Sequence, residues 1–281
     1  MLESKVTRFE DYRISKAPYY EPVGNEVLLF QMAYENKRPV SLRGPTGCGK
    51  TTLTEFMAYT LGLDITAFPY IEVPCHEDIT ETHLLGRYDL DGKWLPGPLY
   101  IGAKYGGMVV LDEFIESRPD VRVLTHSVTD DRRVLSVSKT GEVIQLPDNF
   151  MLVTCYNPGY QIKSKVLKPS TAQRYITIDM GYPSQEIEVK ILMKKTGIEK
   201  EIAVKFVRFA NDVRNMRDSD RIRIQEGVST RLLVMVCELY KSYIRHKLSP
   251  NLKTIAKVAL INPITSEQTD KKVLEELLAI F

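Results

Sequence analysis

Hydrophobic residues are spaced differently in the first two thirds and in the last third of the chain. Up to about residue 182, short apolar runs alternate with stretches in which apolar residues recur at helical spacing. Runs of this length predict buried β-strands. They read PVSLRG, IEVPC, GGMVVLDEF and FMLVTCYN. Strands that alternate with helices are typical of a parallel sheet covered by helices, so this part of the chain predicts an α/β fold.

The last third of the chain carries helical spacing alone. Four stretches after Pro183 show it, and they read SQEIEVKILMKKTG, KEIAVKFVRFANDVRNM, STRLLVMVCELYKSYIRHK and NLKTIAKVALI. Apolar residues at this period predict helices that bury one face. We therefore predict an N-terminal arm over 1–20, an α/β domain over 21–182 and a smaller all-helical domain over 183–281.

Composition and charge narrow the class of protein. Hydrophobic residues make up 43% and charged residues 26% of the 281 residues, as in ordinary soluble globular proteins. The net charge of +2, from 38 basic and 36 acidic side chains, gives no support to a nucleic-acid binder. No apolar run reaches the length of a membrane span, and no signal-peptide pattern begins the chain. Four scattered cysteines without a Cys-x-x-Cys pair indicate reduced thiols, so we expect a cytoplasmic protein. From the charge and the absence of a long apolar run, we expect no nucleic-acid and no membrane partner.

A glycine-rich segment follows the first predicted strand and precedes a helical stretch. Its residues are Gly44, Pro45, Thr46, Gly47, Cys48, Gly49, Lys50, Thr51 and Thr52. This spacing, between a strand and a helix, is typical of a loop whose backbone N–H groups surround the phosphates of a nucleotide. The Lys50 ammonium would reach the β- and γ-phosphates, and the Thr51 hydroxyl would bind Mg²⁺. The segment therefore predicts a site for ATP and Mg²⁺, and leaves GTP open as the nucleotide.

Polar side chains end two further apolar runs. Asp112 and Glu113 follow MVVL, and Asn157 follows MLVTCY. At the end of a strand beside the glycine loop, Asp112 would hold Mg²⁺ and Glu113 would orient or deprotonate the attacking water. Asn157 would hold that water and respond to the γ-phosphate. The competing interpretations are a surface loop that begins with two acids, and a turn-forming asparagine before Pro158.

Arginine guanidinium groups match the charge that spreads over a transferring phosphoryl group. Arg174 lies before a last apolar stretch, Arg132 and Arg133 lie in SVTDDRRVL, and Arg231 lies at the start of a predicted helix. Most arginines in proteins are solvated or ion-paired, so chemistry alone does not choose among these four.

The order of these elements resembles that of the AAA+ ATPases, in particular the CbbQ/NorQ/NirQ family of the MoxR branch. The segments that carry the resemblance are PYYEPVGNEV, RGPTGCGKT, CHEDITETHLLGRY, GPLYIGAKYGG, LDEFIESRPD, VTDDRRVL, YNPGYQ and LKPSTAQR. The resemblance implies a three-layer α/β/α nucleotide-binding domain with a parallel sheet, followed by a helical lid. It also implies that Gly44–Thr51 is the Walker A loop, and that Asp112 and Glu113 are the Walker B pair.

The same resemblance assigns the remaining polar residues. Asn157 corresponds to sensor 1, and Arg231 to sensor 2, which contacts phosphate in its own subunit. Arg174 corresponds to the arginine finger that acts on the neighbouring subunit's ATP. Arg132 and Arg133 stay open as alternatives for the finger.

The resemblance further implies a homo-oligomeric ring, a hexamer, that hydrolyses ATP to remodel, activate or mature a client enzyme. In that family the partner is a von Willebrand A-domain protein, and the client is Rubisco or a metalloenzyme such as nitric oxide reductase. Two other functions stay open. One is a nucleic-acid-dependent AAA+ motor, and the other is a nucleotide-binding adaptor without significant turnover.

Two segments are expected to form β-hairpins. GRYDLDGKWLPG offers Asp91-Gly92 as a tight turn, and RRVLSVSKTGEVIQLPD alternates and turns at Thr140-Gly141. In the family that the chain resembles, the corresponding helix-2 insert and pre-sensor-1 hairpin face the centre of the ring. Trp94, the only tryptophan, is either exposed on the first hairpin or packed against the domain.

Overall fold

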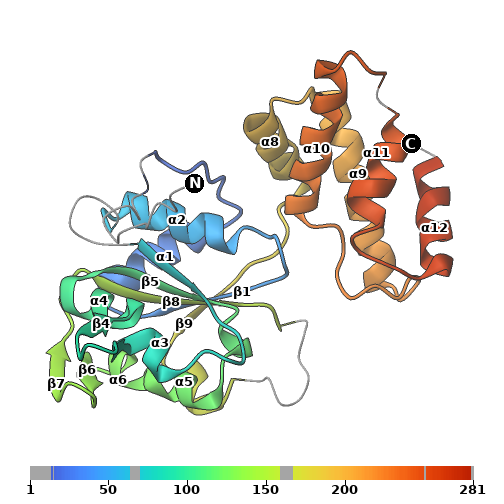
Figure 1. Ribbon diagram of the computed structural model, residues 1–281. Helices are drawn as coiled ribbons and strands as arrows, with labels where there is room; N and C mark the ends of the chain where they lie inside the picture. Colours follow the sequence, from blue (N-terminus) through green and yellow to red (C-terminus); the bar gives the residue numbers. More distant parts are fainter. Residues whose placement is uncertain (1–13, 15, 64–69, 159–166, 250, 280–281) are drawn as a thin grey trace. The chain divides into compact units, whose positions relative to one another are not determined.

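The chain divides into two compact units in a computed structural model (Figure 1). The structure describes residues 14, 16–63, 70–158, 167–249 and 251–279, so most of the predicted arm and part of YNPGYQ lie outside the described residues. Unit 1 contains residues 1–44 and 50–179, and unit 2 contains residues 45–49 and 180–281. The glycine-loop residues 45–49 therefore group with the C-terminal part of the chain.

Unit 1 is built on a five-stranded parallel sheet with the order β2-β5-β8-β1-β9 (Figure 1). Its strands are β1 (Val40–Arg43), β2 (Tyr70–Pro74), β5 (Gly107–Asp112), β8 (Phe150–Tyr156) and β9 (Ile176–Asp179). Every residue of β8 is buried, and so are the first five of β5. Central strands of a parallel sheet are covered on both faces, which explains their unbroken apolar sequence. The α/β class and the four predicted strands are confirmed.

Helices cover both faces of this sheet. Figure 1 shows α1 (Glu26–Glu35) and α2 (Lys50–Thr60) on one face and α4 (Pro98–Tyr105) on the other. Four shorter helices are α3 (Glu81–Leu85), α5 (Pro119–Leu124), α6 (His126–Thr129) and α7 (Pro169–Ala172). Leu53 and Met57 of α2 are completely buried. Shortly after α2, Gly62 adopts a left-handed φ of +68°, as a glycine that closes a helix does.

Both predicted hairpins are confirmed. β3 (Gly86–Tyr88) pairs antiparallel with β4 (Trp94–Pro96), and β6 (Val134–Val137) pairs antiparallel with β7 (Glu142–Gln145). Gly92 and Gly141 have φ of +76° and +72° in the two turns. The Trp94 ring is half-buried and lies edge-on to Tyr88 and Tyr100, with centroids 5.1 and 5.8 Å away. Trp94 therefore packs against the domain.

Unit 2 is a bundle of α8 (Gln185–Thr196), α9 (Lys200–Asp218), α10 (Thr230–Arg245), α11 (Leu252–Ala256) and α12 (Gln268–Ala279). One turn of π-helix, Lys257–Ile261, continues α11. Leu192, Val207, Leu233, Leu260 and Leu274 contribute to one core from five different segments. The helical character predicted from the spacing is confirmed. Among the described residues, no helix combines the length and the apolar character that crossing a bilayer requires.

Candidate nucleotide-binding site

The predicted site residues of unit 1 follow three neighbouring strands at one edge of the sheet. Gly44 follows β1, Asn157 follows β8, and Asp112 ends β5. In the register of the parallel strands, Arg43 is opposite Tyr156 and Leu111 is opposite Thr154. Since β8 lies between β1 and β5, Asn157 follows the strand that lies between the one before Gly44 and the one that ends in Asp112. Ligands of open α/β sheets bind at this carboxyl edge.

The beginning of the glycine loop is tied to the sheet and to the lysine that follows the loop. The Gly44 N–H donates to the Tyr156 carbonyl at 3.2 Å, and the Lys50 ammonium donates to the Gly44 carbonyl at 2.8 Å. Only 8% of Lys50 is exposed. This buried cation stands at the N-terminus of α2, where the helix dipole also favours an anion. The residues present therefore fit a bound phosphate.

The two central glycines of the loop have backbone conformations that other residues rarely adopt. Gly47 has φ of +68° and Gly49 has φ of +107°. Thr51 and Thr52 follow in the first turn of α2 and are both half-buried. The left-handed glycines turn the chain between β1 and α2, and the two threonines lie at the start of that helix.

The acid pair lies where the chain leaves β5 in an unusual conformation. Glu113 has φ of +49° and ψ of +39°, in the left-handed region that non-glycine residues seldom occupy. The fully buried Phe114 and the nearly buried Ile115 follow it in a 3₁₀ turn and hold this conformation in place. Such strained residues cluster at functional sites.

The negative charges of the acids also raise the pKa of neighbouring groups. The pKa of the Cys75 thiol is raised to about 12, first by burial and then by the negative charges of Asp112 and Glu113. Burial, followed by the charges of Asp112 and Glu55, raises the pKa of the Glu72 carboxyl. Negative charge concentrated at this edge of the sheet favours a cation.

The donor set near Asp112 fits magnesium held jointly by protein and nucleotide. Among the described residues, no group of three or more His, Cys, Asp or Glu side chains is arranged to hold a metal ion alone. Mg²⁺ usually takes one or two protein oxygen ligands and completes its shell with water and substrate phosphates. Asp112 at the end of β5 and Thr51 in the first turn of α2 each offer an oxygen ligand of that kind.

The three arginines considered for the finger have different partners. Arg133, at φ of +49°, donates to the carbonyls of Lys37 and Pro147, each at 2.9 Å. Arg132 pairs with Asp130 at 2.7 Å. The half-buried Arg174 follows α7 and donates to the Ser170 carbonyl. Arg133 therefore ties together two segments of its own unit.

Arg174 also affects the chemistry of its surroundings. The pKa of His126 is lowered, first by burial and then by the positive charge of Arg174. The His126 Nε2 atom and the buried Thr171 hydroxyl share a hydrogen bond of 2.9 Å. The neighbouring Tyr175 hydroxyl donates to Thr125 at 3.0 Å. The backbone around Arg174 is thus held by buried side chains on either side.

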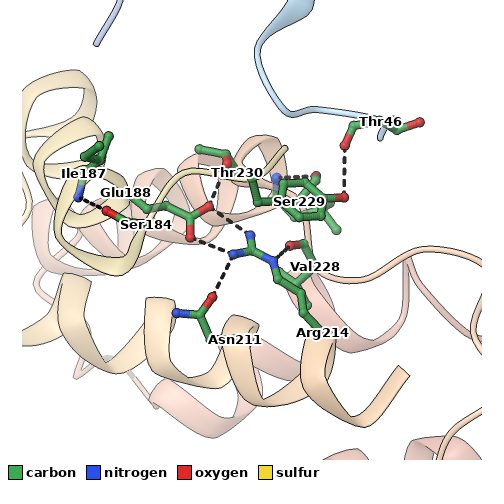
Figure 2. Close-up of polar contacts among 11 residues, drawn as sticks. Thr46, Ser184, Ile187, Glu188, Asn211, Arg214, Val228, Ser229 and Thr230 are labelled. Atoms are coloured by element: carbon green, nitrogen blue, oxygen red, sulfur yellow. Dashed lines mark hydrogen bonds and ion pairs between the residues drawn. The ribbon is translucent and has the colours of Figure 1, made fainter. Parts of the chain in front are cut away.

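Within unit 2, the middle of the glycine loop packs against the segment that begins α10. The Thr46 N–H donates to the Glu226 carboxylate at 3.2 Å, and the Tyr182 hydroxyl donates to the Thr46 carbonyl at 3.3 Å. A Cβ on Gly47 would lie 2.8 Å from the Ser229 hydroxyl oxygen and 3.0 Å from the Arg231 Cβ. Arg231 is exposed in the first turn of α10, and Ser229 caps that helix by accepting from the Leu232 N–H. Figure 2 shows Thr46 and Ser229 in this region.

Sequence reasoning did not identify Glu226 and Tyr182. The only signal for Glu226 was an acidic residue in EGVSTR, shortly before the predicted helix cap. Tyr182 was interpreted as the last residue of the α/β domain.

Two family models together match most of the chain. The one described as AAA domain (dynein-related subfamily) matches residues 39–175, and the one described as CbbQ/NirQ/NorQ C-terminal matches residues 188–281. Protein NorQ of Paracoccus denitrificans is 40% identical to this chain, over 94% of this chain and 93% of NorQ. The chain belongs to the CbbQ/NirQ/NorQ family of AAA proteins. Protein CbbQ of Hydrogenophilus thermoluteolus is 40% identical as well, over 91% of this chain and 92% of CbbQ.

Membership of the CbbQ/NirQ/NorQ family confirms the resemblance found in the sequence. It indicates nucleotide binding and is consistent with a regulatory or activating AAA+ role. Among solved structures, a single-residue variant of RuvB from Thermotoga maritima matches with a TM-score of 0.58 and 15% identity. That match covers 98% of this chain and 80% of RuvB. At this identity it shows a shared AAA fold alone.

Proposed function

We propose that this protein hydrolyses ATP and uses the energy to remodel, activate or mature a client enzyme. One observation carries the proposal: the glycine loop, Asn157 and the Asp112–Glu113 pair follow three adjacent strands at one edge of the sheet. Phosphoryl transfer needs little more from a protein than positioning and charge stabilisation. The hydrogen-bond donors of the glycine loop, the carboxylates of Asp112 and Glu113 and the Asn157 amide are the groups that such positioning requires.

Each of these residues has a defined task in the proposed reaction. Backbone N–H groups of the loop and the Lys50 ammonium hold the β- and γ-phosphates. Thr51 and Asp112 would hold Mg²⁺, which would supply positive charge to neutralise the phosphates. Glu113 accepts a proton from the attacking water or orients it, and Asn157 keeps that water in line with the γ-phosphate.

Two arginines complete the proposed machinery. Arg231 is the second residue of α10, and its Cβ would lie 3.0 Å from a Cβ placed on the loop residue Gly47. In our proposal Arg231 contacts phosphate in its own subunit. Arg174 serves as the finger on the nucleotide of a neighbouring copy in a homo-oligomeric ring, a hexamer. Fingers of this kind raise turnover by about 10³–10⁵-fold.

Family membership supports a role that depends on partner proteins. NirQ of Pseudomonas aeruginosa, which is 38% identical over 93% of this chain and 96% of NirQ, is called a denitrification regulatory protein. That name supports a regulatory or activating role here. We propose a von Willebrand A-domain protein as the partner in a cytoplasmic complex, and Rubisco or a metalloenzyme such as nitric oxide reductase as the client.

The first test is the ATPase rate as a function of protein concentration, with the mass of the assembly measured in parallel. Wild type is compared with Arg174→Ala and with Arg208→Ala, a control that removes an exposed arginine of α9. We expect specific activity to rise as the protein assembles. Arg174→Ala should assemble normally and hydrolyse slowly, and Arg208→Ala should behave as wild type.

Other outcomes point elsewhere. A rate that is independent of concentration, with Arg174→Ala unaffected, contradicts the ring with a finger supplied in trans. Stimulation by DNA or RNA with a steep salt dependence favours the nucleic-acid motor. No turnover at any concentration favours the nucleotide-binding adaptor.

A further inference from the structure

A buried ion pair connects three helices of unit 2 at the start of α10. Glu188 of α8 is completely buried and Arg214 of α9 is 8% exposed. The guanidinium donates to both carboxylate oxygens, each at 2.9 Å, in the parallel arrangement drawn in Figure 2. Such bidentate pairs fix the relative orientation of their two groups as well as their distance.

The remaining bonds of this pair reach the residues just before Arg231. The Arg214 Nε–H donates to the Val228 carbonyl at 2.8 Å, and the Thr230 hydroxyl donates to the Glu188 carboxylate at 2.6 Å. The pair therefore holds one backbone carbonyl and one side chain of the segment Val228–Thr230. Since Arg231 is the next residue, its backbone position depends on these bonds.

Three further neighbours, Tyr182, Asn211 and Gly227, fix Arg214 itself. Its guanidinium lies over the Tyr182 ring, 4.1 Å from the centroid, and also donates to the Asn211 amide oxygen at 2.9 Å. A Cβ on Gly227 would lie 2.8 Å from the Arg214 Cγ, so only glycine allows this approach. Tyr182 is the residue that donates to the Thr46 carbonyl in the glycine loop. Arg214 thus contacts a neighbour of the loop and also the segment that carries Arg231.

Stability alone does not require an ion pair here. Removing two charges from water costs about as much as their attraction returns, and apolar replacements of similar volume are often neutral or stabilising. The hydrophobic core of unit 2 supplies apolar packing, with Leu192, Val207 and Leu233 fully buried. Apolar side chains at the positions of Glu188 and Arg214 could therefore join this core, yet the chain has a charged pair there.

We propose that Glu188 and Arg214 are positioning residues, which hold Val228–Thr230 so that Arg231 stands at a fixed place beside Gly47. This inference rests on the proposed function, in which Arg231 contacts the phosphates of bound ATP. Neither Glu188 nor Arg214 touches the nucleotide in this proposal. A shift of about 1 Å in a positioned group lowers turnover by up to about 10²-fold.

The test replaces both charges by side chains of similar volume. In Glu188→Met/Arg214→Met we expect kcat to fall by about 10- to 100-fold, while KM and the melting temperature change little. The control is Lys257→Met/Glu275→Met, which removes an exposed ion pair of 2.8 Å elsewhere in the same unit. That control should keep normal kcat.

The decisive measurement repeats the substitution in Arg231→Ala. If the pair acts through Arg231, Glu188→Met/Arg214→Met causes no further loss of kcat once Arg231 is gone. A full additional loss overturns the proposal, and so does normal kcat in the double variant with Arg231 present. If the double variant does not fold, Thr230→Val removes only the bond to Glu188 and should show the same dependence on Arg231.

The two proposals fail in different ways. If Arg231→Ala turns over normally, the role of Arg231 in the proposed function is wrong. If Arg231→Ala is slow and both the double variant and Thr230→Val are normal, only the positioning role is wrong.

Discussion

The Thr46 backbone N–H donates to the carboxylate of Glu226, 180 residues further along the chain, at 3.2 Å. Thr46 belongs to the loop whose N–H groups are proposed to hold phosphate. A carboxylate oxygen, like a phosphate oxygen, carries negative charge and accepts hydrogen bonds from N–H groups. In this structure Glu226 therefore makes a contact that a nucleotide would also need.

Glu226→Gln should tighten nucleotide binding. The substitution removes a negative charge that competes with phosphate for the Thr46 N–H, so we expect the Kd for ATP to fall by about 3- to 10-fold. Titration with a fluorescent ATP analogue measures this Kd. High salt should reduce the difference in Kd between wild type and Glu226→Gln. Glu238→Gln, which neutralises an exposed carboxylate of α10, is the matched control. Weaker binding by Glu226→Gln would show that the carboxylate supports the loop rather than competing with phosphate.

Glu113→Gln and Lys50→Ala should separate catalysis from binding. Glu113→Gln keeps the size of the side chain and removes the base, so it should bind ATP normally and lose nearly all turnover. Lys50→Ala removes the buried ammonium from the loop and should lose binding itself. Nucleotide titration measures the binding of ATP by the two variants, and phosphate release measures their turnover. Normal turnover by Glu113→Gln would exclude it as the base.

Gly47→Ala should impair nucleotide binding and lower stability. The new Cβ would meet Ser229 at 2.8 Å and would force a non-glycine residue to φ of +68°. The backbone strain alone costs about 1–2 kcal/mol. Gly62→Ala is a close control, because Gly62 has the same φ and nothing within 4 Å of its Cβ position. We expect thermal unfolding to show a loss of stability in both variants, and titration to show a loss of binding in Gly47→Ala alone.

The Cys75 thiol should make stability depend on pH in the alkaline range. Its pKa is raised to about 12 in the folded protein, mainly by burial, whereas an unfolded thiol titrates at about 8.5. The unfolded state therefore loses this proton first, so the thiol's contribution to stability is complete below about pH 8.5 and declines as pH rises toward 12. Between about pH 8 and pH 10, the melting temperature should fall more in wild type than in Cys75→Ala. An equal fall of the melting temperature in wild type and in Cys75→Ala would show that ionisation of Cys75 does not affect stability.

Several features of the fold follow from local patterns in the sequence. The uninterrupted apolar run of β8 predicts a central strand because both of its faces are covered. The glycine loop is recognisable because the left-handed φ of Gly47 and Gly49 is a local requirement. The acids after β5 and the amide after β8 could be assigned to one edge, since parallel strands all end on the same side.

Other features depend on packing between distant segments. For Trp94 the sequence left two environments open, and the contacts with Tyr88 and Tyr100 decided between them. Arg132, Arg133 and Arg174 have the same chemistry, and only their partners distinguish them. Arg133 is held by the carbonyls of Lys37 and Pro147, which no spacing rule relates to it.

By itself the sequence determined an α/β domain, a phosphate loop and a helical C-terminal part, because hydrophobic period and glycine conformation act over a few residues. Only the tertiary structure decided which charges meet. Among 38 basic and 36 acidic side chains very many pairings exist, and nothing in the spacing selects Glu188 with Arg214. Burial selects them, because a charge removed from water is stable only beside a partner that the fold brings to it.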